Sequence, residues 1–302
     1  MRQIDELKKF SESINGKIIF DYDLKKTNWL NIGGVAKAFF KPENLKEIVE
    51  FLKRFGEKEK IFILGAGSNI LVNDNFFDGI VIKLGKNFSN ISLLSNDTLV
   101  AGSATSDKKL AEFAAKNNIG GLEFLSCIPG TIGGGIRMNS GCFEKEFKDI
   151  VLSVQAVDKI GQVLTIPSSK IKFNYRKTNL DKSLIFLSAT LKGQMSENQK
   201  INNYMEDLIK EKKKTQPTKI KTGGSTFKNP IDQTEEKVWQ LIKKSVPLDT
   251  KFGDAEISKK HCNFFINKNN ASYEDMNKLI EFVKKKVKIK TGIDLETEIE
   301  II

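Results

Sequence analysis

Residues 126–141 constrain the fold more than any other stretch, because they hold five glycines and one proline in sixteen positions. Glycine costs a helix about 1 kcal/mol relative to alanine, and proline lacks the N–H that a helix interior or central strand requires. We therefore expect an irregular loop here. Its core, Gly130-Thr131-Ile132-Gly133-Gly134, combines small side chains, closely spaced N–H groups and a hydroxyl, which is typical of a phosphate-binding loop.

A second glycine-rich stretch, Gly65-Ala66-Gly67-Ser68-Asn69, follows an apolar strand predicted over residues 60–64. A dinucleotide-binding fingerprint needs a third glycine and then a helix. The chain continues instead into Ile70-Leu71-Val72, which is typical of a strand, so a Rossmann fold is excluded. Either glycine-rich stretch alone is compatible with a tight structural turn. Two of them in one domain favour an extended anionic ligand that carries a pyrophosphate.

The residues around both stretches resemble the UDP-N-acetylenolpyruvoylglucosamine reductase (MurB) family. Residues 63–72, ILGAGSNILV, closely resemble its FAD-binding segment. Residues 121–125 (GLEFL) and 128–139 (IPGTIGGGIRMN) resemble its longest motif, and Thr27 with residues 32–34 (IGG) matches the segment that opens its flavin domain. The resemblance extends from about residue 24 to about residue 300. The chain is similar to the shorter, type II form, for which we expect a more open cleft.

This resemblance implies an α+β protein in two functional parts. Residues 1–200 would form an FAD-binding domain of the vanillyl-alcohol-oxidase/PCMH-like type, with a short first subdomain at about 1–64. Residues 201–302 would form a C-terminal α+β substrate-binding domain, and a length of 302 residues fits two domains. Noncovalent FAD would be held by the two glycine-rich stretches and one asparagine: Gly65, Ala66, Gly67, Ser68, Asn69, Gly130, Thr131, Gly133, Gly134 and Asn139.

Apolar periodicity predicts the other elements. Helices are expected around residues 4–14, 45–55, 108–118, 198–214, 238–244 and 273–288, the last with Ser272 as its N-cap. Strands are expected at residues 70–72, 79–84, 98–101, 184–191, 263–267 and 295–302, with a hairpin over 151–166 that turns at Gly161. Residues 223–225 are expected to form a loop.

Phe173-Asn174-Tyr175-Arg176 resembles the family segment that carries a catalytic arginine. The choice of arginine is informative in itself, because only four of the 49 basic residues are arginines. A planar guanidinium keeps its charge and binds a carboxylate through two hydrogen bonds. A surface ion pair is the alternative interpretation of Arg176.

Two further catalytic residues are implied by the resemblance. Ser225 lies in the sequence GGSTFKNP at residues 223–230, which resembles the loop of the family's proton donor. From the residues alone it would be a Gly-Ser turn. Glu296, Glu298 and Glu300 alternate along the last predicted strand and share one face. The resemblance selects Glu298 as the catalytic glutamate.

The implied reaction is the NADPH-dependent reduction of UDP-N-acetylglucosamine enolpyruvate to UDP-N-acetylmuramate through FAD, a step of peptidoglycan precursor synthesis. Arg176 and Glu298 would stabilise the charge that develops on the substrate, and Ser225 would deliver a proton. NADPH and the UDP-sugar would use one cleft in turn. The residues expected to bind the substrate are Tyr175, Asn229 and Lys213, where Lys213 stands for one of three consecutive lysines, Lys212, Lys213 and Lys214.

The net charge of +11 offers nucleic acid as an alternative partner. The basic residues are mostly lysines, spread along the chain and mixed with 38 acidic residues, whereas nucleic-acid sites usually cluster arginines with aromatic residues. We therefore expect no nucleic-acid partner. Another alternative is an oxidase with histidine-linked flavin, but the single histidine, His261, lies outside the predicted FAD domain. His261 is expected to be structural, and a hydrolase arrangement with Ser225 has little support.

Cysteine usage and the apolar pattern argue against disulfide-rich, metal-binding, secreted and membrane proteins. Cys127, Cys142 and Cys262 are scattered, no C-x-x-C occurs, and only one histidine is present, so we expect neither a disulfide framework nor a metal site. No run of about 18 apolar residues occurs, and the N-terminus lacks the apolar core of a signal peptide. We expect a cytoplasmic monomer with no membrane partner.

Overall fold

The computed structural model describes residues 2–218 and 220–302. The chain forms two compact units, each built from three segments of the sequence. Unit 1 comprises Met1–Tyr22, Ala36–Ala66 and Asp78–Lys210, and unit 2 comprises Asp23–Val35, Gly67–Phe77 and Glu211–Ile302. These units differ from the expected domains, residues 1–200 and 201–302, because two N-terminal segments pack with the C-terminal residues. The functional domain division stays a prediction.

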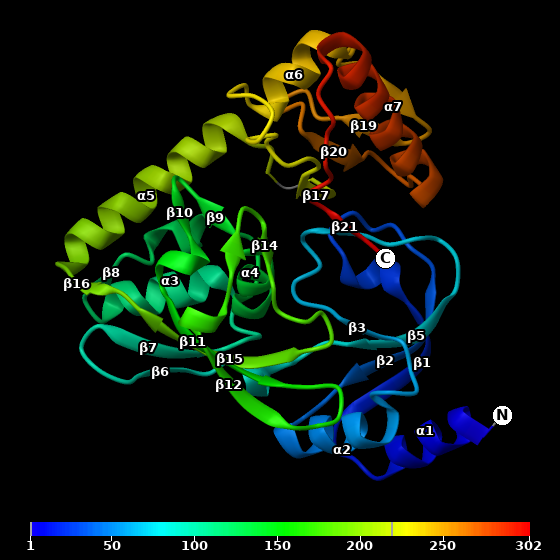
Figure 1. Cartoon of the computed structure of the whole chain (residues 1–302), viewed down its shortest axis with the longest axis vertical. Coiled ribbons are helices and arrows are strands. Elements are labelled where there is room, and N and C mark those ends of the chain that lie inside the picture. The colour runs from blue at the N-terminus through cyan, green and yellow to red at the C-terminus, as the bar shows by residue number, and fades with distance from the viewer. Residues whose placement is uncertain (1, 219) are drawn as a thin grey trace. The chain divides into compact units, whose positions relative to one another are not determined.

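The first part of unit 1 is a four-stranded sheet covered by two helices (Figure 1). The strands lie in the order β1 (Lys17–Asp23), β2 (Val35–Lys41), β5 (Phe77–Ile82) and β3 (Ile61–Ile63). Helices α1 (Arg2–Glu12) and α2 (Leu45–Phe55) pack their apolar faces onto this sheet, as their periodicity predicted. Strand β3 ends where the first glycine-rich stretch begins.

The second part of unit 1 is a five-stranded antiparallel sheet (Figure 1). Its strands lie in the order β12 (Val163–Pro167), β11 (Val151–Val157), β15 (Ile185–Lys192), β7 (Thr98–Gly102) and β6 (Ile91–Leu93). Helices α3 (Asp107–Lys116) and α4 (Ile132–Met138) share one apolar core with this sheet. The predicted hairpin of β11 and β12 is confirmed, and Gly161 lies in its turn at φ +84°.

The expectation that residues 126–141 contain no helix is wrong, because Ile132–Met138 form α4. The reason is packing: a side chain at Gly135 would place its Cβ 2.2 Å from the ring of Phe147, so only glycine allows the helix to approach this closely. Thr131 caps the first turn, with its Oγ1 accepting from the N–H of Gly134 at 3.4 Å. Asn139 ends the helix in the left-handed conformation, at φ +42°.

Short elements complete unit 1. Two-residue strands pair as β9 (Gly141–Cys142) with β10 (Lys145–Glu146), β13 (Phe173–Asn174) with β14 (Lys177–Thr178), and β8 (Ile119–Gly120) with β16 (Gln194–Met195). Helix α5 (Asn198–Thr215) contains the boundary between the units. Single 3-10 turns occupy Lys86–Phe88, Glu123–Cys127, Phe147–Asp149 and Ser168–Lys170 in unit 1, and Leu24–Thr27 in unit 2.

Unit 2 contains an antiparallel sheet covered by two helices. The strand order is β17 (Thr222–Ser225), β20 (Phe264–Asn267), β19 (Ala255–Ile257) and β18 (Lys251–Phe252). Helices α6 (Val238–Ser245) and α7 (Tyr273–Thr291) bury their apolar stripes in this core. Ser272 caps α7 as predicted, since its Oγ accepts from the N–H of Asp275 at 3.1 Å.

Two expectations for unit 2 need correction. Residues 223–225, expected to be a loop, belong to strand β17, in which Thr222 and Ser225 pair with β20 and the two glycines lie at a bulge between them. The terminal strand expected over 295–302 is interrupted, and only β21 (Glu300–Ile301) pairs as a strand, parallel to β4 (Ile70–Leu71). Thr297 forms a separate bridge with Phe227. Within residues 2–218 and 220–302, no helix has the length and apolar character needed to cross a membrane.

Candidate active site

The stretch Gly65-Ala66-Gly67-Ser68-Asn69 connects β3 to β4 without helix or strand. Since strand β4 follows it, the exclusion of a Rossmann fold is confirmed. Among the described residues, no protein group accepts a hydrogen bond from the five backbone N–H groups of this stretch. A run of open N–H groups with small side chains is suited to an anionic group such as a phosphate.

Gly65 brings the two glycine-rich stretches together within unit 1. A Cβ at this position would lie 2.9 Å from Oγ1 of Thr131 and 4.0 Å from Cα of Gly134. Gly65 therefore lies against the first turn of α4, where a side chain would require Thr131 to shift. The sequence predicted two loops that act on one ligand, and these two do lie side by side.

The N–H groups of the second stretch do not match the expectation. Most of them donate to protein carbonyls: Gly130 to Ile128 (3.0 Å), Ile132 to Thr105 (2.9 Å), Gly133 to Ser103 (2.9 Å) and Gly135 to Thr131 (2.8 Å). The closely spaced N–H groups expected in both stretches are therefore open at residues 65–69, whereas most of those at residues 130–135 are used within the protein. Helix α4, which was not expected from the glycine count, uses these groups to anchor its first turn.

In unit 2, residues 23–35 support the second half of the first stretch. The N–H of Trp29 donates to the carbonyl of Gly67 at 2.9 Å. Gly67 is left-handed, at φ +69°, and a Cβ on it would lie 2.1 Å from the carbonyl oxygen of Thr27. The sequence motif at residues 27–34 thus packs directly on the glycine-rich stretch, and Gly34 donates to the carbonyl of Asn73 at 2.8 Å.

Arg176 lies at the tip of the β13–β14 hairpin in a left-handed conformation, at φ +54°, which is unusual for a long side chain. Its side chain is only 17% exposed. Its Nη1 donates to the carbonyl of Asn139 (3.3 Å) and to Glu146 Oε1 (3.2 Å), and its Nη2 donates to the carbonyl of Gly141 (3.3 Å). The half-buried ring of Tyr175 lies 4.9 Å from the guanidinium carbon. The simple surface ion pair considered from sequence does not describe this arrangement.

Asn139 and Glu146 form the rest of this cluster. Asn139 is fully buried, and its Nδ2 donates to Glu146 Oε2 (3.0 Å) and to the carbonyl of Asn174 (3.0 Å). Its Oδ1 accepts from the N–H of Lys148 at 3.0 Å. Hydrogen bonding to Glu146 raises the pKa of the Lys148 ammonium group. Because α4 has seven residues, it separates Thr131 from this cluster by about 10 Å.

In unit 2, Ser225 ends β17, opposite Phe264, and its side chain is half-buried. No hydrogen bond to its hydroxyl occurs within the described residues. Asn263 fixes the residues that follow, since it accepts from the N–H groups of Thr226 (2.7 Å, backbone) and Phe227 (3.0 Å, Oδ1). The Nδ1 of His261 accepts from the N–H of Asn263 at 3.3 Å, and burial lowers the pKa of this imidazole.

Glu298 is held from both sides through its backbone. Its N–H donates to the carbonyl of Thr226 at 2.8 Å, and its carbonyl accepts from Asn69 Nδ2 at 3.0 Å. The carbonyl of Asn69 in turn accepts from the N–H of Glu300 at 3.0 Å. Unit 2 therefore joins the last residue of the glycine-rich stretch, the residue after Ser225 and the selected glutamate in one hydrogen-bonded group.

The three alternating glutamates have different environments. The Glu296 side chain is 74% exposed and forms an ion pair with Lys228 at 2.6 Å. Glu298 and Glu300 are half-buried. Leu295 and Ile299 are buried on the opposite face, so the predicted alternation holds despite the interrupted strand, although Ile301 is exposed. This difference separates Glu298 from Glu296 but not from Glu300.

The predicted substrate-binding residues of unit 2 lie at element ends. Asn229 precedes α6, and its Oδ1 accepts from the N–H of Val238 at 3.0 Å. Lys213 is exposed in the last turn of α5, and its carbonyl accepts from Lys260 Nζ at 2.5 Å. Lys214 forms an ion pair with Glu211 at 3.0 Å. These contacts leave the choice among the three lysines open.

Asp107 and Glu146 are two notable residues that sequence reasoning missed. Asp107 is the first residue of α3 and fully buried, and neither carboxylate oxygen has a hydrogen-bond partner within the described residues. Its Oδ2 would be 2.5 Å from a Cβ on Gly130. Burial raises the pKa of this carboxyl well above its ordinary value. An acidic residue in a first helical turn is usually exposed, so the sequence carried no signal of this burial.

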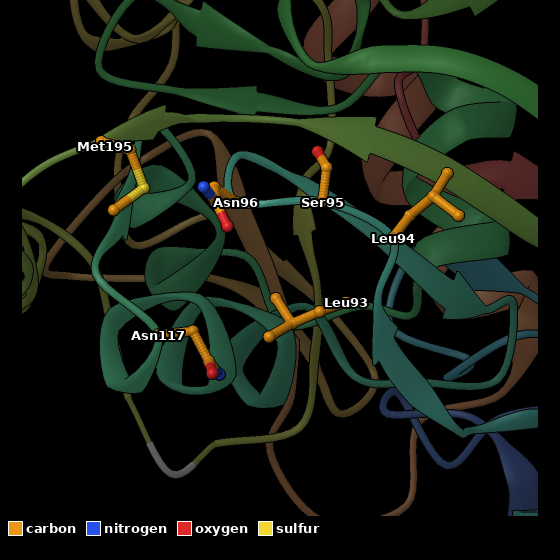
Figure 2. A pocket seen from close by; sticks show the side chains of 6 residues that line it. All are labelled: Leu93, Leu94, Ser95, Asn96, Asn117 and Met195. Carbon is orange, nitrogen blue, oxygen red and sulfur yellow. The ribbon is translucent and has the colours of Figure 1, made fainter.

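One surface pocket lies outside these groups. Figure 2 shows the residues that line it: Leu93, Leu94, Ser95, Asn96, Asn117 and Met195. Its apolar side chains are exposed, and none of its residues was predicted to bind a ligand. None of the sequence-predicted site residues lines this pocket.

Family models match two parts of the chain. Residues 36–167 match an FAD binding domain, and residues 216–302 match the C-terminal domain of UDP-N-acetylenolpyruvoylglucosamine reductase. The UDP-N-acetylenolpyruvoylglucosamine reductase of Pelagibacter ubique is 66% identical over 299 residues, which are 99% of each chain. The chain belongs to the UDP-N-acetylenolpyruvoylglucosamine reductase family.

Other relatives agree with this family. The enzyme of the same name from Rickettsia conorii is 43% identical over 287 residues, 95% of this chain and 96% of the relative. The crystal structure of UDP-N-acetylenolpyruvylglucosamine reductase (MurB) from Thermus caldophilus has a TM-score of 0.81 at 28% identity and covers 95% of this chain and 99% of that one. The predicted family and the predicted α+β fold with an FAD-binding domain are confirmed.

Asp107→Asn tests the buried carboxyl through the free energy of unfolding. A raised folded-state pKa means that the folded chain binds the proton more tightly, so stability is lost as pH rises from the unfolded pKa toward the folded one. Asp107→Asn has no carboxyl to titrate at this position, so its stability does not fall with pH in this way. Urea unfolding should give similar stabilities near pH 4 and a variant advantage that grows by about 1.4 kcal/mol per pH unit between the two pKa values.

The exposed residue Asp232, changed to Asn, is the matched control for loss of one carboxylate. An Asp107→Asn advantage that stays constant with pH would contradict the raised pKa of this buried carboxyl.

Proposed function

We propose that this chain reduces UDP-N-acetylglucosamine enolpyruvate to UDP-N-acetylmuramate with NADPH and bound FAD, as the UDP-N-acetylmuramate dehydrogenase of peptidoglycan precursor synthesis. Its membership of the reductase family and its FAD-binding domain support this activity. The observation that carries the proposal is the contact of Asn69 with Glu298. It ties the open N–H stretch directly to the residue selected as catalytic.

The residues of the glycine-rich stretches fit a flavin dinucleotide. Residues 65–69 provide open N–H donors for the pyrophosphate, and Gly65 can lie against Thr131 because it has no side chain. Gly130, Thr131, Gly133 and Gly134 form the adjoining surface, where their small size, not their N–H groups, permits close approach. Asn139 acts from within the protein, through its hydrogen bonds to neighbouring groups. Bound FAD supplies hydride transfer from NADPH to the vinyl carbon of the substrate.

Arg176 and Glu298 stabilise the negative charge that develops on the adjacent carbon and its carboxylate once the vinyl carbon has accepted hydride. Arg176 contributes a fixed positive charge whose geometry is set by two carbonyls and Glu146. Glu298 contributes a hydrogen bond, and its backbone is fixed on both sides.

Ser225 delivers the proton that completes the reduction. A serine hydroxyl is a weak acid, so it protonates only a strongly basic, carbanion-like carbon and needs no histidine partner. Its hydroxyl makes no hydrogen bond within the described part of the chain, which leaves its proton available. The bonding of His261 within its own turn agrees with a structural role for that residue.

Substrate binding is assigned to Tyr175 for the reacting end, and to Asn229 and one of the lysines at positions 212–214 for the UDP part. NADPH and the UDP-sugar use the same cleft in turn. We infer a cytoplasmic monomer, since the UDP-sugar is a small anionic metabolite and the reaction needs no second chain.

Ser225→Ala separates the two halves of the reaction. The variant should keep the rate at which NADPH reduces the flavin, because no substrate proton is involved. Oxidation of the reduced enzyme by the enolpyruvyl sugar should slow by about 100-fold or more. Stopped-flow absorbance measures each half separately. Unchanged oxidation in the variant would contradict proton delivery by Ser225.

Glu298→Gln tests the selection among the three glutamates. Turnover should fall by at least about tenfold, because the amide replaces the group that stabilises the developing charge. Glu296→Gln and Glu300→Gln remove the same carboxylate charge from neighbouring positions and should stay within about twofold of wild type. Equal losses in all three variants would contradict the assignment of Glu298.

A further inference from the structure

We infer that Glu146 is a positioning residue for Arg176, which it orients for the substrate carboxylate. The role rests on the proposed function, because it is expressed only if Arg176 acts on the substrate. Glu146 lies in β10, and its carboxylate touches three groups at once. Oε1 is 3.2 Å from Arg176 Nη1, while Oε2 is 3.0 Å from Asn139 Nδ2 and 2.8 Å from Lys148 Nζ.

The carboxylate is the anionic member of a small buried cluster. The Glu146 side chain is 15% exposed and the Arg176 side chain 17%. Two neutral groups that also accept hydrogen bonds from the guanidinium are the carbonyls of Asn139 and Gly141. Charge-assisted hydrogen bonds are stronger than neutral ones, so Glu146 provides the strongest of these described contacts.

The backbone around this cluster is strained. Asn139, Phe143, Glu144 and Arg176 all have positive φ, at +42°, +51°, +64° and +54°. Phe143 and Glu144 are the two turn residues of the β9–β10 hairpin, a geometry that normally selects asparagine and glycine. Such strain persists only where surrounding contacts fix it, and it is common at functional sites. Here the strained turn places the Glu146 side chain against Arg176.

Glutamine cannot replace this carboxylate. The site needs two acceptor oxygens, one for Arg176 and one shared by Asn139 and Lys148. A glutamine offers a single oxygen, and in either amide orientation its NH2 group faces another donor. Glu146→Gln therefore leaves the volume nearly unchanged and disturbs the orientation of the guanidinium.

The experiment compares Glu146→Gln with Glu144→Gln in the full-length enzyme. Glu144 lies on the same hairpin, is exposed, and has no side-chain hydrogen bond or ion pair within the described residues. For Glu146→Gln we expect oxidation of the reduced flavin by the enolpyruvyl sugar to slow at least about tenfold, with flavin reduction by NADPH within about twofold. FAD content and calorimetric affinity for the enolpyruvyl sugar should match those of Glu144→Gln to within about threefold, and the temperature of thermal unfolding should match to within a few degrees.

A second arm places Glu146→Gln in an Arg176→Lys background. If Glu146 acts through Arg176, its substitution in this background should lower the rate of flavin oxidation by less than about twofold, because the guanidinium that it orients is absent. Multiplicative losses in the double variant would overturn the inference. So would Glu146→Gln rates equal to those of Glu144→Gln, or parallel losses of both half-reactions and FAD, which would indicate a purely structural role. Wild-type enzyme that the enolpyruvyl sugar fails to oxidise would overturn the proposed function itself, a result visible before any variant is made.

Discussion

The approach of Gly65 to Thr131 is the constraint on which the rest of this structure depends. A hypothetical Cβ on Gly65 would lie 2.9 Å from the Thr131 hydroxyl oxygen, so a larger residue fits only if Thr131 shifts. This approach places the start of the stretch with open N–H groups against the first turn of α4. The other end of α4 is Asn139, whose carbonyl and side chain lead to Arg176 and Glu146. One short helix thus links the surface suited to a pyrophosphate with the guanidinium proposed to act on the substrate.

In unit 2, hydrogen bonds to the backbone connect the glycine-rich stretch with a proposed catalytic residue. Asn69 closes the glycine-rich stretch and holds the carbonyl of Glu298, while Thr226 accepts from the N–H of Glu298. The proposed proton donor, Ser225, is the residue before Thr226. Only two residues of the terminal segment form strand β21. The segment can still serve as a scaffold, because the backbone groups of Glu296, Glu298, Glu300 and Ile302 are each hydrogen-bonded to another segment.

Many elements of the fold were predictable from local sequence, and the features that were missed all depend on contacts between residues far apart in the chain. Strand β4 after the glycine-rich stretch, the cap at Ser272 and the stripe of α7 follow from residue pattern alone. Helix α4 was missed because the cost of its glycines is offset by packing against Phe147, which no local pattern reveals. Glu146 lies 30 residues from Arg176, and Asp107 is buried by a loop more than twenty residues away. Without an alignment, contacts at such separations leave no trace in one sequence.

The most direct test of this account is the FAD content of a chain with a side chain at Gly65. Wild-type protein, and Gly85→Val, where a Cβ would meet nothing within 4 Å, should purify with stoichiometric FAD. Gly65→Val should keep a cooperative unfolding transition and lose most of its FAD, and Gly65→Ala provides the milder substitution if the valine variant does not fold. Folded Gly65→Val with full FAD content would contradict the claim that this contact shapes the cofactor site.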